Sequence, residues 1–167
     1  MVTLAVLVCT HNPRRDYLER TLNALRAQSL PAERWELLVV DNASDPPLAG
    51  NLDLSWHARS RIVTEHELGI LPARVRGLKE TRTPLILFVD DDNVLAPDYL
   101  QQAMPIADTH PFLGVWGGSI TPEFEPPPPR IVRGRAAGPA ARLRNRRRVA
   151  AKSRAIGMDR PALIRIS

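Results

Sequence analysis

The sequence predicts an α/β protein with a mostly parallel open sheet and helices on both faces. Three nearly unbroken apolar runs, at residues 3–8, 35–40 and 85–89, have the composition of strands buried on both faces. Segments with helical spacing of apolar residues separate these runs, and such alternation favours a parallel sheet. The chain of 167 residues is long enough for one domain with a proper core.

The first half of the chain is predicted as strand, helix, strand and strand. Behind the first strand, Asn12 is a favourable helix N-cap and Pro13 a favourable first helical residue. The apolar stripe of this helix consists of Leu18, Leu22 and Leu25. The second strand ends in a polar, proline-containing loop, 41–47. Residues 48–60 have too weak a pattern for an assignment, and 61–64 is predicted as a short third strand.

The second half continues the alternation. Pro72 suits the first turn of a helix that is expected to run to about Thr81, and the strand 85–89 follows it. A further helix is expected to open at Pro97, and Pro105 is expected to kink or end that helix. A fifth strand is predicted at 112–118, where glycines permit a close approach of another backbone.

The charge distribution divides the chain into unlike segments. Residues 1–129 hold 11 Lys and Arg against 17 Asp and Glu, a net charge of −6, whereas residues 130–167 hold 12 against 1, a net charge of +11. The boundary is a run of four prolines, 126–129, which cannot continue a sheet or the interior of a helix. We therefore expect a domain at 1–125, a break at 126–129 and a basic low-complexity tail at 130–167.

Three interpretations of the tail stay open. Its composition is typical of a disordered, solvated extension, and the abrupt change of composition also fits a frameshift in a GC-rich reading frame. The arginine-rich stretch 144–148 offers a third interpretation, attraction to the phosphates of nucleic acid or of an anionic membrane surface. The tail has no aromatic residue for base stacking, so nucleic acid is not the expected partner.

Other features bear on the compartment. The single cysteine, Cys9, excludes an internal disulfide and fits a reducing environment. No apolar run approaches the roughly 18 residues that span a bilayer, and the start of the chain lacks the features of a signal peptide. We expect a cytoplasmic protein, with peripheral attachment to the inner face of the membrane as an alternative.

Three carboxylates follow the most hydrophobic strand directly, at Asp90, Asp91 and Asp92. Two such groups about 4 Å apart repel each other by about 4 kcal/mol at an effective dielectric constant near 20, so their burial requires a counter-charge. Mg²⁺ or Mn²⁺ prefers oxygen ligands and shares them with phosphate. A metal site is therefore predicted, and a solvated acidic turn is the alternative.

The expected parallel sheet brings other polar residues to the same place. Parallel strands end at one edge, and ligands of open α/β sheets bind outside that edge. The polar residues at the ends of the first two strands are Thr10, Asn12, Asp41 and Asn42. The glycine-rich phosphate loops of dinucleotide-binding and P-loop proteins are absent from the sequence. A phosphate bound here would be met by a metal and by Arg74 or Arg76, although either arginine can instead belong to a solvated helix face. The four histidines lack metal-ligand spacing and are expected to be structural or solvated.

The strand ends and the residues around them resemble the nucleotide-sugar-binding half of family 2 glycosyltransferases, which have the GT-A fold. The matching stretches are Thr10-His11-Asn12, Val39 to Asp45, Ala73-Arg74 and Phe88 to Asp92, and their order and spacing match over about residues 3–123. The resemblance implies a Rossmann-like sheet, a nucleotide-diphospho-sugar donor, with a UDP-sugar expected first, and a divalent cation.

The resemblance also implies roles for individual residues. Thr10 and Asn12 would line the nucleotide pocket, and Asp41 would contact the base or the ribose. Asp90 and Asp92 match the family's aspartate-x-aspartate motif, which holds the metal and the sugar nucleotide, with Asp91 close by. Arg74 matches a family arginine, but a valine follows it where the family usually has asparagine.

Resemblance ends near residues 124–125, before the acceptor-binding half that supplies the general base in this family. We therefore expect a truncated, donor-binding half, with the catalytic base and the acceptor unknown. The implied reaction of an intact relative is inverting glycosyl transfer. Two alternatives are a non-catalytic nucleotide-binding module and a receiver-like signalling domain. The second alternative lacks the acid pair expected after the first strand and the lysine expected after the last.

Overall fold

The computed structural model describes residues 2–123, 152–155 and 162–165. The helices are α1 (Arg15–Arg26), α2 (Ile70–Glu80) and α3 (Tyr99–Thr109), with a 3-10 turn, η1 (Ala32–Arg34). The first five strands are β1 (Leu4–Thr10), β2 (Trp35–Asn42), β3 (Ser60–Glu65), β4 (Leu85–Asp90) and β5 (Asn93–Leu95). The other four strands are β6 (Val115–Gly117), β7 (Ser119–Pro122), β8 (Lys152–Ala155) and β9 (Ala162–Arg165).

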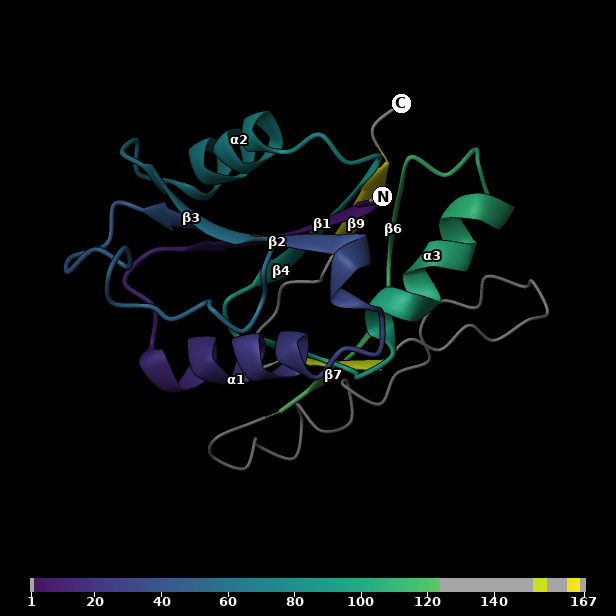
Figure 1. Ribbon diagram of the computed structural model, residues 1–167, viewed down its shortest axis with the longest axis horizontal. Helices are drawn as coiled ribbons and strands as arrows, with labels where there is room; N and C mark the ends of the chain where they lie inside the picture. Colours follow the sequence, from purple (N-terminus) through teal and green to yellow (C-terminus); the bar gives the residue numbers. More distant parts are fainter. Residues whose placement is uncertain (1, 124–151, 156–161, 166–167) are drawn as a thin grey trace, which may run out of the picture.

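The main sheet has six strands in the order β3-β2-β1-β4-β9-β6. Strands β1 to β4 are mutually parallel, as predicted, and β9 is antiparallel to both of its neighbours. A second sheet has the order β5-β8-β7. Helix α2 covers one face of the main sheet, and α1 and α3 lie on the other side (Figure 1). This is the open α/β architecture that the sequence predicts.

Alternate residues of the buried strands build two separate cores. Leu4, Val6 and Val8 of β1 pack on the side of α1 and α3, whereas Ala5 and Leu7 face α2. Each fully buried aliphatic side chain of this size contributes about 1.5–3 kcal/mol relative to an exposed one. Both faces of β1 are covered, and this explains why nearly every residue of the strand is apolar.

Helix α2 lies unusually close to the sheet at one residue. A Cβ atom added to Gly77 would lie 3.0 Å from Leu7 Cδ2 and 3.4 Å from Val40 Cγ2. A glycine at this point therefore lets the helix approach the strands without displacing their side chains. The approach matters for function because the first turns of the same helix border the candidate site described below.

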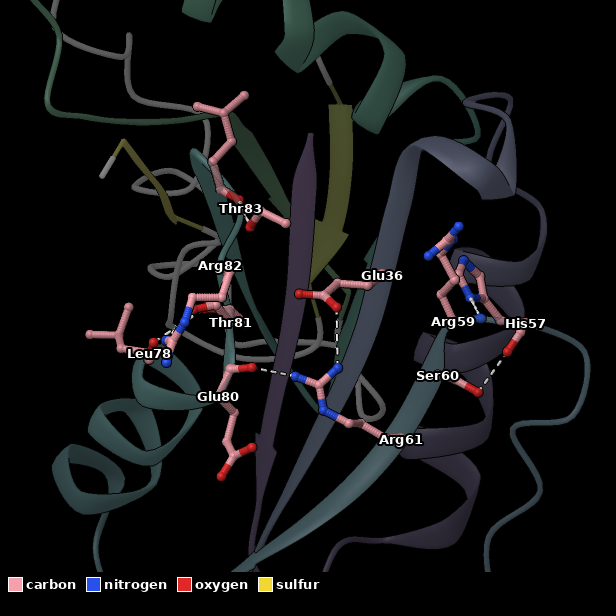
Figure 2. Close-up of polar contacts among 11 residues, drawn as sticks. Glu36, His57, Arg59, Ser60, Arg61, Leu78, Glu80, Thr81, Arg82 and Thr83 are labelled. Carbon is pink, nitrogen blue, oxygen red and sulfur yellow. Dashed lines mark hydrogen bonds and ion pairs between the residues drawn. The ribbon is translucent and has the colours of Figure 1, made fainter. Parts of the chain in front are cut away.

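Arg61 of β3 links β2 and α2 near the end of the sheet at which the parallel strands begin (Figure 2). Its guanidinium lies 3.1 Å from a Glu36 carboxylate oxygen of β2 and donates a second bond to the Glu80 carbonyl at the end of α2. Beside it, the Ser60 hydroxyl donates to the carbonyls of Leu54 and His57, at 2.9 and 2.7 Å. These bonds order part of the stretch 48–60 that the sequence left unassigned.

The structure narrows two sequence-based expectations in the second half, and of the kink or end expected at Pro105 it excludes the end. Pro105 does not end α3, which continues to Thr109. The proline lies on the exposed side of the helix, where water can reach the carbonyl that loses its partner, while Leu100, Ala103 and Ala107 anchor the buried side. A strand does lie within the predicted range 112–118, but it is shorter, because only β6 (Val115–Gly117) is extended there, and β7 begins at Ser119 in the other sheet.

The basic segment contributes backbone to both sheets. Strand β8 pairs with β5 and β7, and β9 pairs with β4 and β6. The partners of these two strands lie more than 30 residues away in the sequence, and the division at 126–129 and the three interpretations of the stretch 130–167 stay predictions. The proline run 126–129 and the arginine stretch 144–148 lie outside the described residues. Within the described part of the chain, no helix has the length and apolar character needed to cross a bilayer.

Candidate functional site

The ends of three neighbouring strands meet at the carboxyl edge of the sheet. Thr10 of β1 is paired in register with Asp41 of β2, and Cys9 of β1 with Asp90 of β4. The convergence expected from the sequence is therefore observed. It follows from the parallel pairing of β1 with both neighbours, which places the polar ends of all three strands side by side.

A cavity of about 490 Å³ opens at this edge. One side of it is acidic and polar, and another is apolar and formed around the start of α2. Its lining residues are Cys9, Thr10, His11, Asn42, Leu68, Gly69, Ile70, Ala73, Asp90, Asp91 and Asp92. A cavity of this size with convergent polar groups has the dimensions of a small-molecule site.

The acid cluster, Asp90 to Asp92, is held by neutral and cationic donors. The Asp90 carboxylate accepts bonds from Arg74 Nη2 at 3.3 Å and from Asn93 Nδ2 at 3.2 Å, one on each oxygen. The Thr10 hydroxyl donates to Asp91 Oδ2. Donors of this kind disperse part of the negative charge, which offsets the mutual repulsion of the carboxylates.

Asp41 supports the loop that follows β2. It is 1% exposed, and its two carboxylate oxygens accept the backbone N–H groups of Ser44 at 3.1 Å and of Leu48 at 2.8 Å. Asp41 is not among the residues that line the 490 Å³ cavity. Direct contact of Asp41 with a base or ribose stays a prediction, and the structure adds a supporting role that the sequence did not indicate.

Asn42 connects the same loop to the start of α2. Its side-chain amide donates to the carbonyls of Glu65 at 3.2 Å and of Glu67 at 2.7 Å, and its oxygen accepts the Gly69 N–H at 2.8 Å. Gly69 has a φ of 141°, a backbone conformation that favours glycine. The apolar wall of the cavity is thereby fixed to the end of β2.

Asn12 does not line the 490 Å³ cavity, and its expected place in a nucleotide pocket stays a prediction. With a φ of 45° it turns away from the 490 Å³ cavity and borders a second cavity of about 210 Å³. Its side-chain oxygen accepts the Asp45 N–H at 2.8 Å, and its backbone N–H donates to Ser44 Oγ at 2.9 Å. The left-handed turn, which asparagine tolerates better than most residues, explains this position. Asn12 joins the two loops instead of lining the larger cavity.

His11 completes this junction. Its Nδ1 lies 2.7 Å from the Asn42 carbonyl oxygen, and its Nε2 lies 3.1 Å from Asn12 Nδ2. A carbonyl can only accept and an amide nitrogen can only donate, so the pattern assigns a neutral imidazole protonated on Nδ1. The expectation of a structural histidine agrees with this arrangement, although His11 also lines the cavity.

The two candidate arginines have separate surroundings. Arg74 contacts Asp90, and its guanidinium carbon lies 5.4 Å from the centre of the Phe88 ring. Arg76 instead pairs with Glu80 at 2.9 Å, one helical turn further along α2. Arg74 is therefore the arginine that the fold brings to the acid cluster.

Cys9 at the floor of the cavity is a buried thiol. Burial raises its pKa to about 12, with a smaller lowering by Arg74 and a smaller raising by Asp90. The thiol therefore stays protonated and unreactive at neutral pH. Its role in the cavity is that of a small apolar surface.

The carboxylates of the acid cluster suit a hard cation only if water or a bound phosphate supplies further ligands. Asp90 and Asp92 line the cavity, and carboxylate oxygens are the ligand type of Mg²⁺ and Mn²⁺. Across the described ranges, however, no group of three or more His, Cys, Asp or Glu side chains is placed to hold a metal. The residues fit a cation that takes its remaining ligands from water and from phosphate oxygens.

Two supporting residues were missed by the sequence analysis. Asn93 bonds to Asp90, and the Thr21 hydroxyl of α1 donates to the Asp91 carbonyl at 3.0 Å. A signal existed for both. Asn93 directly follows the three acids, and the fully buried Thr21 interrupts the leucine stripe of α1 with a polar group.

Comparison with known proteins identifies the family of the chain. The family model of glycosyl transferase family 2 matches residues 5–160. The chain is 31% identical over 105 residues to validoxylamine A glucosyltransferase of Streptomyces hygroscopicus subsp. jinggangensis, a match that covers 60% of this chain and 24% of that protein. It is 27% identical over 113 residues to poly(ribitol-phosphate) beta-N-acetylglucosaminyltransferase TarS of Staphylococcus aureus, covering 66% of this chain and 20% of that protein.

Solved structures agree in fold. The crystal structure of S. aureus TarS 1-349 superposes with a TM-score of 0.64 at 24% identity, covering 77% of this chain and 39% of that one. The complex of the same protein with UDP gives a TM-score of 0.63 at 25% identity, with 77% and 38% covered. The chain spans less than a third of the length of the curated relatives it matches. From the match over residues 5–160 we conclude that the chain belongs to glycosyl transferase family 2 and has the α/β fold of its GT-A members.

Proposed function

We propose that the 490 Å³ cavity binds a nucleotide-diphospho-sugar, with a UDP-sugar as the first candidate, together with Mg²⁺ or Mn²⁺. The observation that carries the proposal is the position of three carboxylates, Asp90 to Asp92, at the joint end of three parallel strands and beside an apolar wall. Besides the UDP complex named above, a crystal structure of S. aureus TarS 1-349 in complex with UDP-GlcNAc is similar to this chain, with a TM-score of 0.62. Their similarity to this chain supports the same class of ligand here.

The two sides of the cavity suit the two parts of such a donor. The apolar wall around Ile70 and Ala73 suits the flat base, and the acidic side would hold the cation, which would supply positive charge near the diphosphate. Thr10 and Asp91 line the same cavity, where the Thr10 hydroxyl donates to the Asp91 carboxylate, and both carry polar groups that suit the ribose. Asn12 and Asp41 would act indirectly, because their hydrogen bonds hold the loops that border the site.

The proposed reaction is inverting glycosyl transfer to an acceptor. The acceptor oxygen forms a bond to the anomeric carbon while the bond from that carbon to the diphosphate oxygen breaks, and the nucleoside diphosphate leaves with the electron pair. A general base takes the acceptor proton. When bound, the cation would neutralise charge that develops on the leaving diphosphate. Arg74 at the acid cluster adds a positive charge on the same side.

The acceptor and the general base stay unassigned. The site described above contributes the leaving-group side of the reaction, and each of its carboxylates lies in the cluster or in a supporting loop. A non-catalytic nucleotide-binding module is therefore the second candidate function. The observation that favours it is that Asp41, a carboxylate close to the site, is already committed to two backbone N–H groups.

Calorimetric titration of the 167-residue chain tests the proposal. UDP, GDP and ADP are titrated separately, each with Mn²⁺ and with EDTA. We expect binding of UDP that requires Mn²⁺ and is tighter than that of the two purine nucleotides. Binding of all three nucleotides with equal affinity, or of none, would contradict the proposed donor class. Release of UDP from UDP-sugars in the presence of acceptor mixtures then distinguishes a transferase from a binding module.

A further inference from the structure

The Arg74 guanidinium stands where a positive ion at the acid cluster would be expected. Its Nη2 atom lies 3.3 Å from Asp90 Oδ1, the carboxylate that the cation is proposed to share. The side chains of Arg74 and Asp90 are 38% and 19% exposed, so the pair is only partly screened by water. The pair therefore supplies counter-charge to the cluster in the state described here.

The position of Arg74 is fixed by its surroundings but not enclosed by them. Phe88 and Asp90 lie two residues apart on β4 and so point to the same face of the sheet, the face that α2 covers. The guanidinium lies beside the ring of Phe88, at 5.4 Å, and beside the carboxylate of Asp90. The neighbouring residue on α2, Ala73, lines the cavity. A modest rotation of the Arg74 side chain therefore leaves it at the edge of the same cavity.

We propose that Arg74 is a resident counter-ion that a divalent cation displaces from Asp90, and that the displaced guanidinium then binds the diphosphate of the donor. This inference rests on the proposed donor function. A guanidinium keeps its charge at any physiological pH, and its planar set of donors matches phosphate oxygens. The same side chain thus serves two partners in turn, a carboxylate before loading and a phosphate after it.

The exchange has a thermodynamic consequence. A cation that arrives alone must compete with Arg74 for Asp90, so it binds more weakly than the carboxylates would otherwise allow. A cation that arrives with a diphosphate gives Arg74 a new partner. Metal and nucleotide therefore strengthen each other's binding, and the coupling is reciprocal. Removal of the guanidinium is expected to raise the affinity for the metal alone and to reduce the coupling.

Measurement of Mn²⁺ binding by electron paramagnetic resonance, without and with saturating UDP, tests this directly. The variants are Arg74→Gln, Arg74→Lys and the matched control Arg76→Gln. The control removes the same charge from the same helix, at a side chain of similar exposure, 40%, that pairs with Glu80 instead of the acid cluster. The control therefore reports the long-range effect of one lost charge.

Without UDP, we expect Arg74→Gln to bind Mn²⁺ about two- to five-fold more tightly than the wild type, the range that a partly exposed ion pair provides. Arg76→Gln should match the wild type, and Arg74→Lys should lie between them. With UDP, the gain of affinity for Mn²⁺ should be smaller in Arg74→Gln than in the wild type.

Other outcomes overturn the inference. If the wild type binds UDP with Mn²⁺ but Arg74→Gln and Arg76→Gln have equal Mn²⁺ affinities, the exchange is wrong and the proposed donor function stands. Weaker Mn²⁺ binding by Arg74→Gln also contradicts the exchange. If neither the wild type nor Arg74→Gln binds Mn²⁺, with or without UDP, both the exchange and the proposed use of a metal fail.

Discussion

Replacement of Asp41 by alanine is expected to destabilise the chain through the loop that follows β2. The carboxylate is 1% exposed and accepts two backbone hydrogen bonds, at 3.1 and 2.8 Å. Hydrogen bonds to a charged group contribute about 1.5–3 kcal/mol each. The loss of both would cost about 3–6 kcal/mol if the loop stayed in place. Because the N–H groups of Ser44 and Leu48 can find water once the loop relaxes, we expect a loss near the lower end, about 3 kcal/mol.

Urea unfolding followed by circular dichroism measures this loss. Asp45→Ala is the matched control, since its carboxylate lies in the same loop and is exposed, and surface changes of this kind usually stay within about 0.5 kcal/mol. Asp41→Asn, which keeps one acceptor oxygen, should fall between the control and Asp41→Ala. A loss below about 1 kcal/mol for Asp41→Ala, or equal losses for Asp41→Ala and Asp45→Ala, would refute the supporting role of Asp41.

Three further predictions concern packing, pH and the sheet edge. Leu100→Ala removes a side chain with no exposed surface and should cost about 2–5 kcal/mol of unfolding free energy, whereas Leu71→Ala, at a residue 70% exposed, should cost little in the same denaturation assay. Burial lowers the pKa of His57 below its usual 6.5, so the unfolded chain binds more protons in acid. The free energy of unfolding should therefore have its full value above about pH 7 and decrease towards pH 5. The urea midpoint should fall less between pH 7 and pH 5 in His57→Gln than in the wild type. Arg61→Met breaks a partly exposed ion pair with Glu36 and should lower the urea midpoint by the equivalent of about 1 kcal/mol; an unchanged midpoint would contradict the role of Arg61 in Figure 2.

The parts of the fold that local chemistry determines could be predicted from the sequence. The apolar runs of β1, β2 and β4 require burial on both faces, so their parallel arrangement and the meeting of their polar ends follow from composition and spacing. Strands β8 and β9 could not be found in this way. Each consists of four residues in a basic context, and each forms through pairing with strands that are distant in sequence. Local propensity carries little information about such pairing.

The candidate site was predictable as a set but not in its division of roles. Residue types and strand ends indicate Thr10 and the three acids, all of which line the cavity. The positive φ of Asn12 turns that residue towards another loop, and no pattern in the sequence reveals such a turn. The hydrogen bonds of Asp41 likewise depend on the path of residues 43–48. Roles that arise from the shape of a loop require the structure.

The most direct test of the proposed donor site is the Mn²⁺ dependence of UDP binding in Asp92→Ala. Asp92 lines the cavity, and Asp108→Ala, at an exposed residue of α3, is the matched control. By calorimetry, the wild type and Asp108→Ala should bind UDP much more tightly with Mn²⁺ than with EDTA. In Asp92→Ala the two conditions should give nearly the same weak affinity. An Asp92→Ala variant that keeps the full Mn²⁺ dependence of the wild type would contradict the assignment of the acid cluster as the metal and diphosphate site.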